Sequence, residues 1–368
     1  MPLFAPKTDK IFSISVIVLS IIGFFIFSSA SLGLVAKDGV EYQSVALNQG
    51  VSLLLGFIGF IILNRINLGF IRKYAWILFL GALIMNLLLF VPSLALEHGG
   101  ATRWLHLGFY TFQPSELLKV ATIIYCATWL ASLKKEITTP KALYVCLSII
   151  GVISLLLIAQ SDTDTLVVIS TTCLAMLFVS GARLKYVISI ILLGMVLIGG
   201  IIAVRPYAAK RIMTFINPSS DPYGSSYQIQ QSLIAIGSGG YFGKGYGQSV
   251  QKFSYLPEPI GDSIFAVTGE EFGFLGGVVL IALFVIVCLR GLKIASGSDD
   301  VWNRLVATGI VVLIAVESFM NMSSMLGIIP LSGMPLLFVS HGGTALITIL
   351  GAAGLLSGIS RGRGKIRS

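Results

Sequence analysis

Ten apolar stretches, each long enough to cross a bilayer, dominate this chain of 368 residues. A transmembrane helix needs about 17 to 25 mainly apolar residues to span a hydrocarbon core of about 30 Å. The stretches lie at 11–35, 46–64, 74–96, 114–133, 142–161, 164–182, 184–204, 263–289, 305–329 and 336–360. The sequence therefore predicts an all-α polytopic membrane protein with ten transmembrane helices, folded as one integral membrane domain over residues 1–368.

Composition supports a membrane protein and excludes several other classes. The chain is 55% hydrophobic and 11% charged, with a mean hydropathy of +0.92, values that soluble domains do not approach. All four cysteines fall inside apolar stretches, where they act as small hydrophobes, and the three histidines are scattered. No spacing indicates a disulfide or a zinc site, and nucleic-acid binding is not indicated.

Basic residues predict the orientation, because positively charged short loops stay in the cytoplasm. The termini and alternate loops hold 17 of the 25 basic residues. These are Lys7, Lys10, Arg65, Arg72, Lys73, Lys134, Lys135, Lys141, Arg183, Lys185, Arg290, Lys293, Arg304, Arg361, Arg363, Lys365 and Arg367. Both termini are therefore expected in the cytoplasm, and the first helix is expected to remain uncleaved.

Two longer segments, 96–114 and 205–261, then face the extracytoplasmic side. The second is a large loop of 57 residues between predicted helices 7 and 8, too long for a turn. Its glycines allow tight turns and close approach of backbone N–H groups to a ligand. A flexible loop, or a re-entrant hairpin whose glycines serve packing, explains them equally well.

Acidic residues follow this loop directly. Asp262 could simply cap the next helix, where its carboxylate would meet unpaired N–H groups. Glu270 and Glu271 lie two turns further along, where a carboxylate at bilayer depth costs about 2.5 to 3.5 kcal/mol. They therefore need polar partners.

A candidate partner is the pair Glu116 and Lys119, three residues apart and thus on one helical face. The two could satisfy only each other. That arrangement would leave Asp162, Glu270, Glu271 and Glu317 unpaired. We therefore expect a shared polar cavity within the helix bundle, which Arg103 could join.

Three motifs carry a family resemblance. They are GATRWLHLGFYTFQPSELLKV (100–120), RIMTFINPSSDPYGSSYQIQQSLIAIGSGGYFGKGYGQSVQKFSYLPEPIGDSIFAVTGEEFGF (211–274) and PLSGMPLLFVSHGG (330–343). Over essentially the whole chain, the sequence resembles the shape, elongation, division and sporulation family of peptidoglycan glycosyltransferases. Within it, the chain looks more like the division member FtsW than the elongation member RodA.

The resemblance implies a fold of ten helices and an enzyme that polymerises lipid II, the undecaprenyl-diphosphate-linked disaccharide pentapeptide. The reaction would occur at the outer face of the bacterial cytoplasmic membrane. The implied partners are a class B penicillin-binding transpeptidase and other membrane proteins of the division complex. The implied catalytic residue is Asp262 of the LPE-x-x-x-D motif, and the expected substrate-binding residues are Arg103, Trp104, Gln113, Ser115, Glu116, Lys119, Lys252 and Glu258.

Two positions depart from the family pattern. The usual P-D-x-G-T reads Ser161, Asp162, Thr163, Asp164, Thr165, which keeps the first aspartate and loses Pro and Gly. The usual S-Y-G-G has His341 in place of tyrosine. The first change affects a turn and the second the last outer loop, and neither removes Asp262.

Joining a sugar hydroxyl to an anomeric carbon with inversion needs one base and cations that hold the departing diphosphate. Asp262 is expected to be this base, or to orient the hydroxyl, with Asp162, Glu270 and Glu271 supporting a polar cavity. Candidate cations are Arg103, Lys119, Arg205, Lys210, Arg211 and Lys252. A divalent cation such as Mg²⁺ could accompany the diphosphate, although no ligand spacing identifies a metal site.

Other functions fit parts of the same pattern. A flippase for lipid-linked precursors would also have buried charges and glycine-broken helices, but would need charges spread along a transverse path. A non-catalytic scaffold for the transpeptidase would leave Asp262 as a helix cap. A RodA-type elongation polymerase is the alternative within the family.

Overall fold

The computed structural model describes residues 8–38, 42–98, 101–106, 111–204, 206–217 and 225–364. Helices account for most of these residues, as the apolar stretches predict. The longer ones are α1 (Lys10–Asp38), α2 (Tyr42–Arg65), α4 (Ala75–Leu87), α5 (Pro114–Ser132), α6 (Pro140–Ala159), α7 (Thr163–Val179), α8 (Leu184–Val204), α9 (Pro206–Ile216), α10 (Ser225–Ser238), α12 (Ile264–Ser296), α13 (Val301–Met325) and α14 (Gly343–Ser360).

Each of the ten predicted spans overlaps one helix, and these helices are α1, α2, α4, α5, α6, α7, α8, α12, α13 and α14. By length and composition, six helices in the described residues could cross a membrane, and three shorter apolar helices accompany them. The chain is thus a multi-pass membrane protein. The count of ten crossings stays a prediction.

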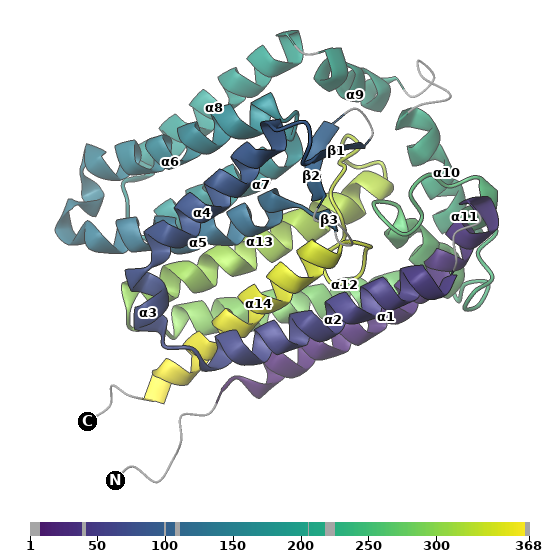
Figure 1. Ribbon diagram of the computed structural model, residues 1–368, viewed down its shortest axis with the longest axis horizontal. Coiled ribbons are helices and arrows are strands. Elements are labelled where there is room, and N and C mark those ends of the chain that lie inside the picture. The colour runs from purple at the N-terminus through teal and green to yellow at the C-terminus, as the bar shows by residue number, and fades with distance from the viewer. Residues whose placement is uncertain are drawn as a thin grey trace.

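The start of α1 and the end of α14 lie at one end of the bundle, as does α3 (Leu68–Lys73) (Figure 1). The strands, α10 and the short α11 (Gln251–Ser254) lie at the other end. The described parts of the two long segments, both predicted to lie on one side of the membrane, are therefore found at the same end of the bundle.

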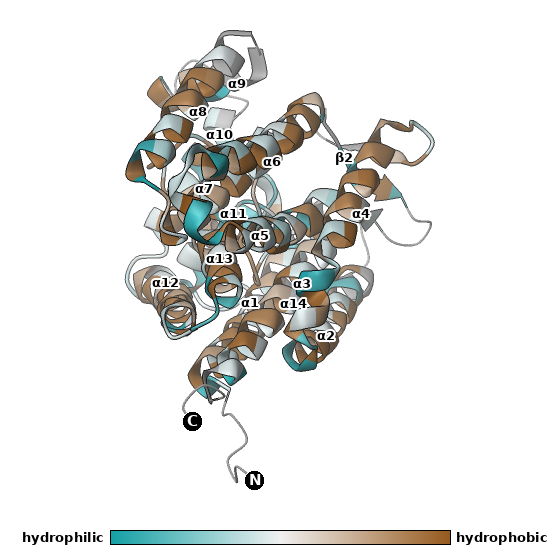
Figure 2. Ribbon diagram, turned by 90° about the vertical axis from the view of Figure 1, so that its left-hand side faces the viewer, coloured by the Kyte–Doolittle hydropathy of each residue, from teal (hydrophilic) through white to brown (hydrophobic). Residues whose placement is uncertain are grey.

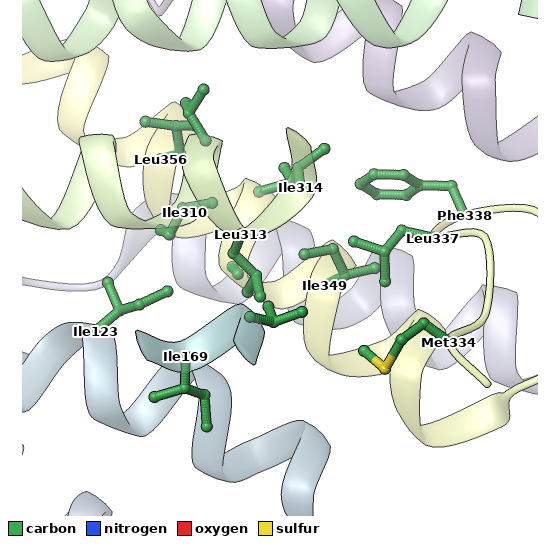
Figure 3. Close-up of a cluster of buried hydrophobic side chains, with 14 of the residues drawn as sticks. Ile123, Ile169, Ile310, Leu313, Ile314, Met334, Leu337, Phe338, Ile349 and Leu356 are labelled. Carbon is green, nitrogen blue, oxygen red and sulfur yellow. The ribbon is translucent and has the colours of Figure 1, made fainter. Parts of the chain in front are cut away.

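The centre of the bundle is formed by α13 and α14. Within their apolar windows, 72% and 78% of residues are buried, against 22% to 44% for the other long spans. Apolar side chains from α5, α7, α13, α14 and the loop before α14 meet there (Figure 3). The backbones of α14 and α2 also approach each other closely at Gly354. A Cβ at this position would lie 2.4 Å from the Phe60 carbonyl oxygen of α2, so only glycine fits there.

Apolar residues also cover the outward faces of the helices (Figure 2). Leu155 and Val196 are 77% and 72% exposed. Such exposure would be unfavourable in water but suits contact with lipid, since lipid tails are as apolar as leucine.

Two predicted spans have boundaries that differ from expectation. The span 74–96 stops at the 3₁₀ helix η1 (Leu88–Phe90), because Pro92 disfavours a helical conformation at Val91. A three-stranded antiparallel sheet follows, with β1 (Ala95–His98), β2 (Ala101–His106) and β3 (Thr111–Phe112) in the order β1-β2-β3. The sequence analysis missed this small sheet.

The span 336–360 begins as a helix only at Gly343. Before it, Phe338 has φ +66°, and the loop bonds to the segment that precedes α12. Ser340 Oγ donates to the Gly261 carbonyl at 2.7 Å, and the His341 N–H donates to the Ile260 carbonyl at 2.7 Å. These tertiary contacts replace the helical hydrogen bonds.

The glycine-rich segment docks into a break in α12. Gly273 has φ +67°, which interrupts the helix, and the freed backbone groups bond to the glycine segment. Lys244 N–H donates to the Glu270 carbonyl at 3.0 Å, and Phe274 N–H donates to the Gly240 carbonyl at 2.8 Å. These glycines therefore serve close packing against α12.

Candidate active site

Lys119 lies between two buried carboxylates. Its Nζ is 2.9 Å from Glu116 Oε1 on the same helix and 2.7 Å from Glu317 Oε2 on α13. The three side chains are 2%, 3% and 0% exposed. The expected contact between Glu116 and Lys119 is therefore present, and Glu317 completes it as a triad that ties α5 to α13.

Arg103 reaches the start of α7 from strand β2. Its Nη2 donates to the Ser161 carbonyl oxygen, and its Nη1 is 3.9 Å from Asp162 Oδ1. Asp162 Oδ2 is buried without a hydrogen bond from the described part of the chain. Asp162 also lies near enough to Glu317 for their charges to interact, so it links the Lys119 triad to Arg103.

The turn that leads into α7, where the sequence departs from the family motif, contains Ser161 with φ +57°. This left-handed conformation is uncommon for residues other than glycine. It aims the Ser161 carbonyl at Arg103, so the turn is held by a charged hydrogen bond in place of the missing proline.

Asp164 and Arg211 form a second ion pair beside this turn. Arg211 Nη1 donates to Asp164 Oδ1 and Oδ2 at 3.0 and 2.8 Å. The Gly333 N–H also donates to Asp164 Oδ2, at 3.1 Å. Asp164 therefore joins α7, α9 and the loop before α14.

Asp262 lies beside the ion pair of Asp164 and Arg211. A Cβ built on Gly333 would lie 3.4 Å from Arg211 Nη2 and 3.7 Å from both Asp164 Oδ2 and Asp262 Oδ2. The backbone carbonyl of Asp262 accepts a hydrogen bond from Asn321 Nδ2 at 2.8 Å, which fixes the start of α12 against α13. Gly333 thus leaves a gap lined by one cation and two carboxylates.

The helix-cap interpretation of Asp262 is wrong. The residue at the N-cap of α12 is Ser263, and no side chain caps the helix there. Asp262 is half-buried, and its carboxylate is available for another role.

Burial and neighbouring carboxylates raise the pKa of Asp262 to about 7. Desolvation is the largest cause, followed by the negative charges of Glu258 and Asp164, while Arg211 and Arg103 act in the opposite direction. A carboxyl with a pKa near neutrality suits proton transfer. The site thus combines a group able to accept a proton with two arginines able to hold an anion.

Glu258 shapes the approach to Asp262. It has φ +46°, and its carbonyl accepts hydrogen bonds from Gly261 N–H and Ser263 N–H at 3.1 and 3.2 Å. Its side chain is exposed. The motif spacing of four residues therefore reflects a tight turn that brings the two carboxylates within electrostatic reach.

The remaining predicted substrate contacts are mixed. Trp104 is half-buried and pairs with Leu96 across the sheet. Gln113 Nε2 donates to the buried Ser115 Oγ at 3.2 Å at the start of α5. Arg205 lies outside the described residues, as does the side chain of Lys210.

Lys252, Glu270 and Glu271 form a cluster apart from the Lys119 triad, and a substrate contact for Lys252 stays a prediction. Lys252 Nζ lies 2.5 Å from Glu271 Oε1 and 3.0 Å from Ser29 Oγ, and the lysine is 1% exposed. Glu270 accepts from Lys244 Nζ at 2.6 Å and from Ser249 Oγ at 2.5 Å. The expected single cavity is corrected to two clusters, because these carboxylates hold the glycine segment instead of the Lys119 triad.

Sequence reasoning missed the importance of Asp164 and Gly333. Asp164 occupies the position where the motif has glycine, and this departure could have identified it. Nothing local distinguishes Gly333, whose role depends on three side chains distant in sequence.

Residues 9–365 match the family described as cell cycle protein, that of FtsW, RodA and SpoVE. Stage V sporulation protein E of Bacillus subtilis is 37% identical over 83% of this chain and 84% of that protein. The probable peptidoglycan glycosyltransferase FtsW of Geobacter sp. strain M18 is 35% identical over 96% of each chain.

Solved structures show the same fold. A chain from a study of polymerisation and crosslinking by a peptidoglycan synthase complex has a TM-score of 0.77 at 23% identity, covering 98% of this chain and 99% of that chain. The rod shape determining protein RodA of Thermus thermophilus has a TM-score of 0.70 at 23% identity, covering 98% of each chain.

Proposed function

The chain belongs to the cell cycle protein family of FtsW, RodA and SpoVE, and from this premise we propose which reaction its polar site performs. It is a peptidoglycan glycosyltransferase, as the curated names of its FtsW relatives indicate. Its substrate is lipid II, which it polymerises into glycan strands with inversion at the anomeric carbon. Its role is in cell division, because relatives named FtsW match 96% of the chain.

One observation carries the assignment of the site: Asp262 shares a gap beside Gly333 with Arg211, and its pKa is about 7. In the proposed step, the acceptor hydroxyl oxygen bonds to the anomeric carbon of the donor while the bond to the diphosphate breaks. Asp262 takes the hydroxyl proton. Arg211 and Arg103 bind the departing diphosphate, whose negative charge grows as the bond breaks.

The diphosphate is already a good leaving group, so a second, protonated carboxyl is not required. The described residues contain no group of three or more His, Cys, Asp or Glu that could hold a metal ion. A divalent cation accompanying the diphosphate stays a prediction.

The orientation follows from charge. We propose a bacterial cytoplasmic membrane protein with its basic loops and termini inside and with Asp262 near the outer face. In support, the strands, α10 and α11 lie at the end of the bundle opposite the start of α1 and the end of α14 (Figure 1).

The proposed partner is a class B penicillin-binding transpeptidase, acting with other membrane proteins of the division complex. In support, a chain of the same fold comes from work on a complex that coordinates polymerisation and crosslinking. A flippase or a passive scaffold would not need a proton acceptor in the gap beside Gly333.

The test is polymerisation of labelled lipid II by the purified protein, with and without a class B transpeptidase, read as glycan length on a gel. The Asp262→Asn variant keeps the size of the side chain and removes the proton acceptor. We expect it to fold and to bind lipid II, and to lose about 10² to 10⁴ in rate. The matched control is Asp300→Asn, a similar change at the N-cap of α13, where Asn caps about as well as Asp.

The wild-type rate should also rise with pH and reach half its plateau near pH 7, because the base acts in its deprotonated form. Near-normal glycan synthesis by well-folded Asp262→Asn would end the catalytic assignment. If the protein reconstituted in liposomes moved lipid II across the bilayer and made no polymer, the flippase would be favoured.

A further inference from the structure

Asp164, the ion-pair partner of Arg211, has no part in the reaction described above, yet its carboxylate faces the proposed base. The two side chains are 13% and 15% exposed. Both oxygens of Asp164 accept from one guanidinium nitrogen, Nη1, while Nη2 faces the Gly333 gap. Asp164 therefore fixes which edge of Arg211 faces that gap.

The sequence places Asp164 well for this task. It lies in the first turn of α7, where the helix dipole stabilises a negative charge. The Gly333 N–H donates a further hydrogen bond to its Oδ2, at 3.1 Å. These contacts hold the carboxylate in place from two directions, so Arg211 rests on a rigid support.

We propose that Asp164 is a positioning residue that holds the Arg211 guanidinium beside Asp262 and sets the electrostatic balance at that carboxyl. This inference rests on the proposed function, since it concerns the same base. Asp164 occupies the position at which the family motif has glycine, so the device belongs to this chain and not to the motif.

All charged groups that face Asp262 enter the balance. Glu258 on its own segment and Asp164 on α7 disfavour the ionised form, while Arg211 on α9 and Arg103 on β2 favour it. His341, in the loop before α14, is close enough to Glu258 for their charges to interact. Among these groups, Asp164 and Arg211 have a direct ion pair that a single substitution can break.

The two partners predict opposite effects. Asp164→Asn removes a negative charge that disfavours ionisation of Asp262, so it lowers the pKa of that carboxyl. Arg211→Gln removes a positive charge that favours ionisation, so it raises the pKa of Asp262. A charge at this range shifts a pKa by about 1 pH unit. The double variant should return close to the wild type.

The experiment reads the protonation of Asp262 in two ways on the full-length protein. The first is the pH at half-maximal polymerisation of lipid II. The second needs no catalysis: a hydrophobic carbodiimide reacts with protonated carboxyls, and mass spectrometry of the peptide with Asp262 gives the labelled fraction at each pH. Asp164→Gly serves as a second neutral variant, and Asp300→Asn as the control.

We expect both midpoints to fall by about 1 pH unit in Asp164→Asn and Asp164→Gly, and to rise by about the same amount in Arg211→Gln. Unchanged midpoints in folded single variants, or shifts in the same direction, would overturn the inference. Shifted labelling midpoints in a protein that makes no polymer would support the inference and refute the proposed function.

Discussion

Lys119 Nζ lies 2.7 Å from Glu317 Oε2, and this contact joins α5 to α13 across 198 residues of sequence. Glu116 contacts the same ammonium group at 2.9 Å. Two carboxylates and one lysine, all buried, form a unit in which each charge depends on the others. Asp162 connects this unit to Arg103 and so to the Asp262 site.

The triad should behave as one unit in a double-mutant cycle. Lys119→Met leaves two buried carboxylates without a cation, and Glu317→Gln weakens the hold on Lys119. Breaking such a buried pair costs about 3 to 5 kcal/mol, so each single variant should lose much of its stability and polymerisation activity. The double variant should lose little more than either. Thermal unfolding and glycan synthesis are measured for the wild type, the two single variants and the double variant. Strictly additive losses would disprove the coupling.

The gap beside Gly333 predicts a loss of activity without unfolding. In Gly333→Ala the new methyl group would lie 3.4 to 3.7 Å from Arg211, Asp164 and Asp262, which are ordinary contact distances. We expect the protein to fold normally and to lose up to about 10² in polymerisation rate, because the methyl group fills the gap and shifts the substrate from its reactive position. Gly81→Ala on α4 is the control, since its Cβ would meet nothing within 4 Å. An active Gly333→Ala enzyme would place the reaction elsewhere.

Lys252 should matter for the glycine segment more than for substrate. It is buried against Glu271 and Ser29. Lys252→Met should therefore lower the free energy of opening of residues 239–255, measured by hydrogen exchange, by about 3 to 5 kcal/mol. Lys244→Met is the matched comparison, because Lys244 is 35% exposed and a partly exposed pair contributes about 1 kcal/mol or less. If Lys252 bound diphosphate instead, its variant would keep the protection and lose affinity for lipid II.

Orientation can be tested by cysteine labelling in intact cells. Phe242 is 82% exposed in the segment predicted to lie outside, and Asp299 is exposed in a loop predicted to lie inside. In a background without native cysteines, a membrane-impermeant maleimide should label Phe242→Cys and spare Asp299→Cys until the cells are opened. The reverse result would invert the topology.

The amino-acid sequence determined the membrane class, the approximate positions of the helices and the choice of Asp262 as the proposed base. Long apolar stretches must form helices in lipid, because only a helix satisfies its backbone hydrogen bonds within one segment. Basic loops predict orientation by the same local logic. The motif from Glu258 to Asp262 could be recognised because its residues are close in sequence, and the family resemblance implied the role of Asp262.

Tertiary structure decided which charges meet. Lys119 could pair with several buried carboxylates, and only the packing of α5 on α13 selects Glu317. Glu270 and Glu271 bind the glycine segment because α12 breaks at Gly273 and admits that segment. The Gly333 gap brings α7, α9 and the start of α12 together. Such contacts depend on the geometry of helices distant in sequence, which hydrophobic periodicity and motif spacing do not encode.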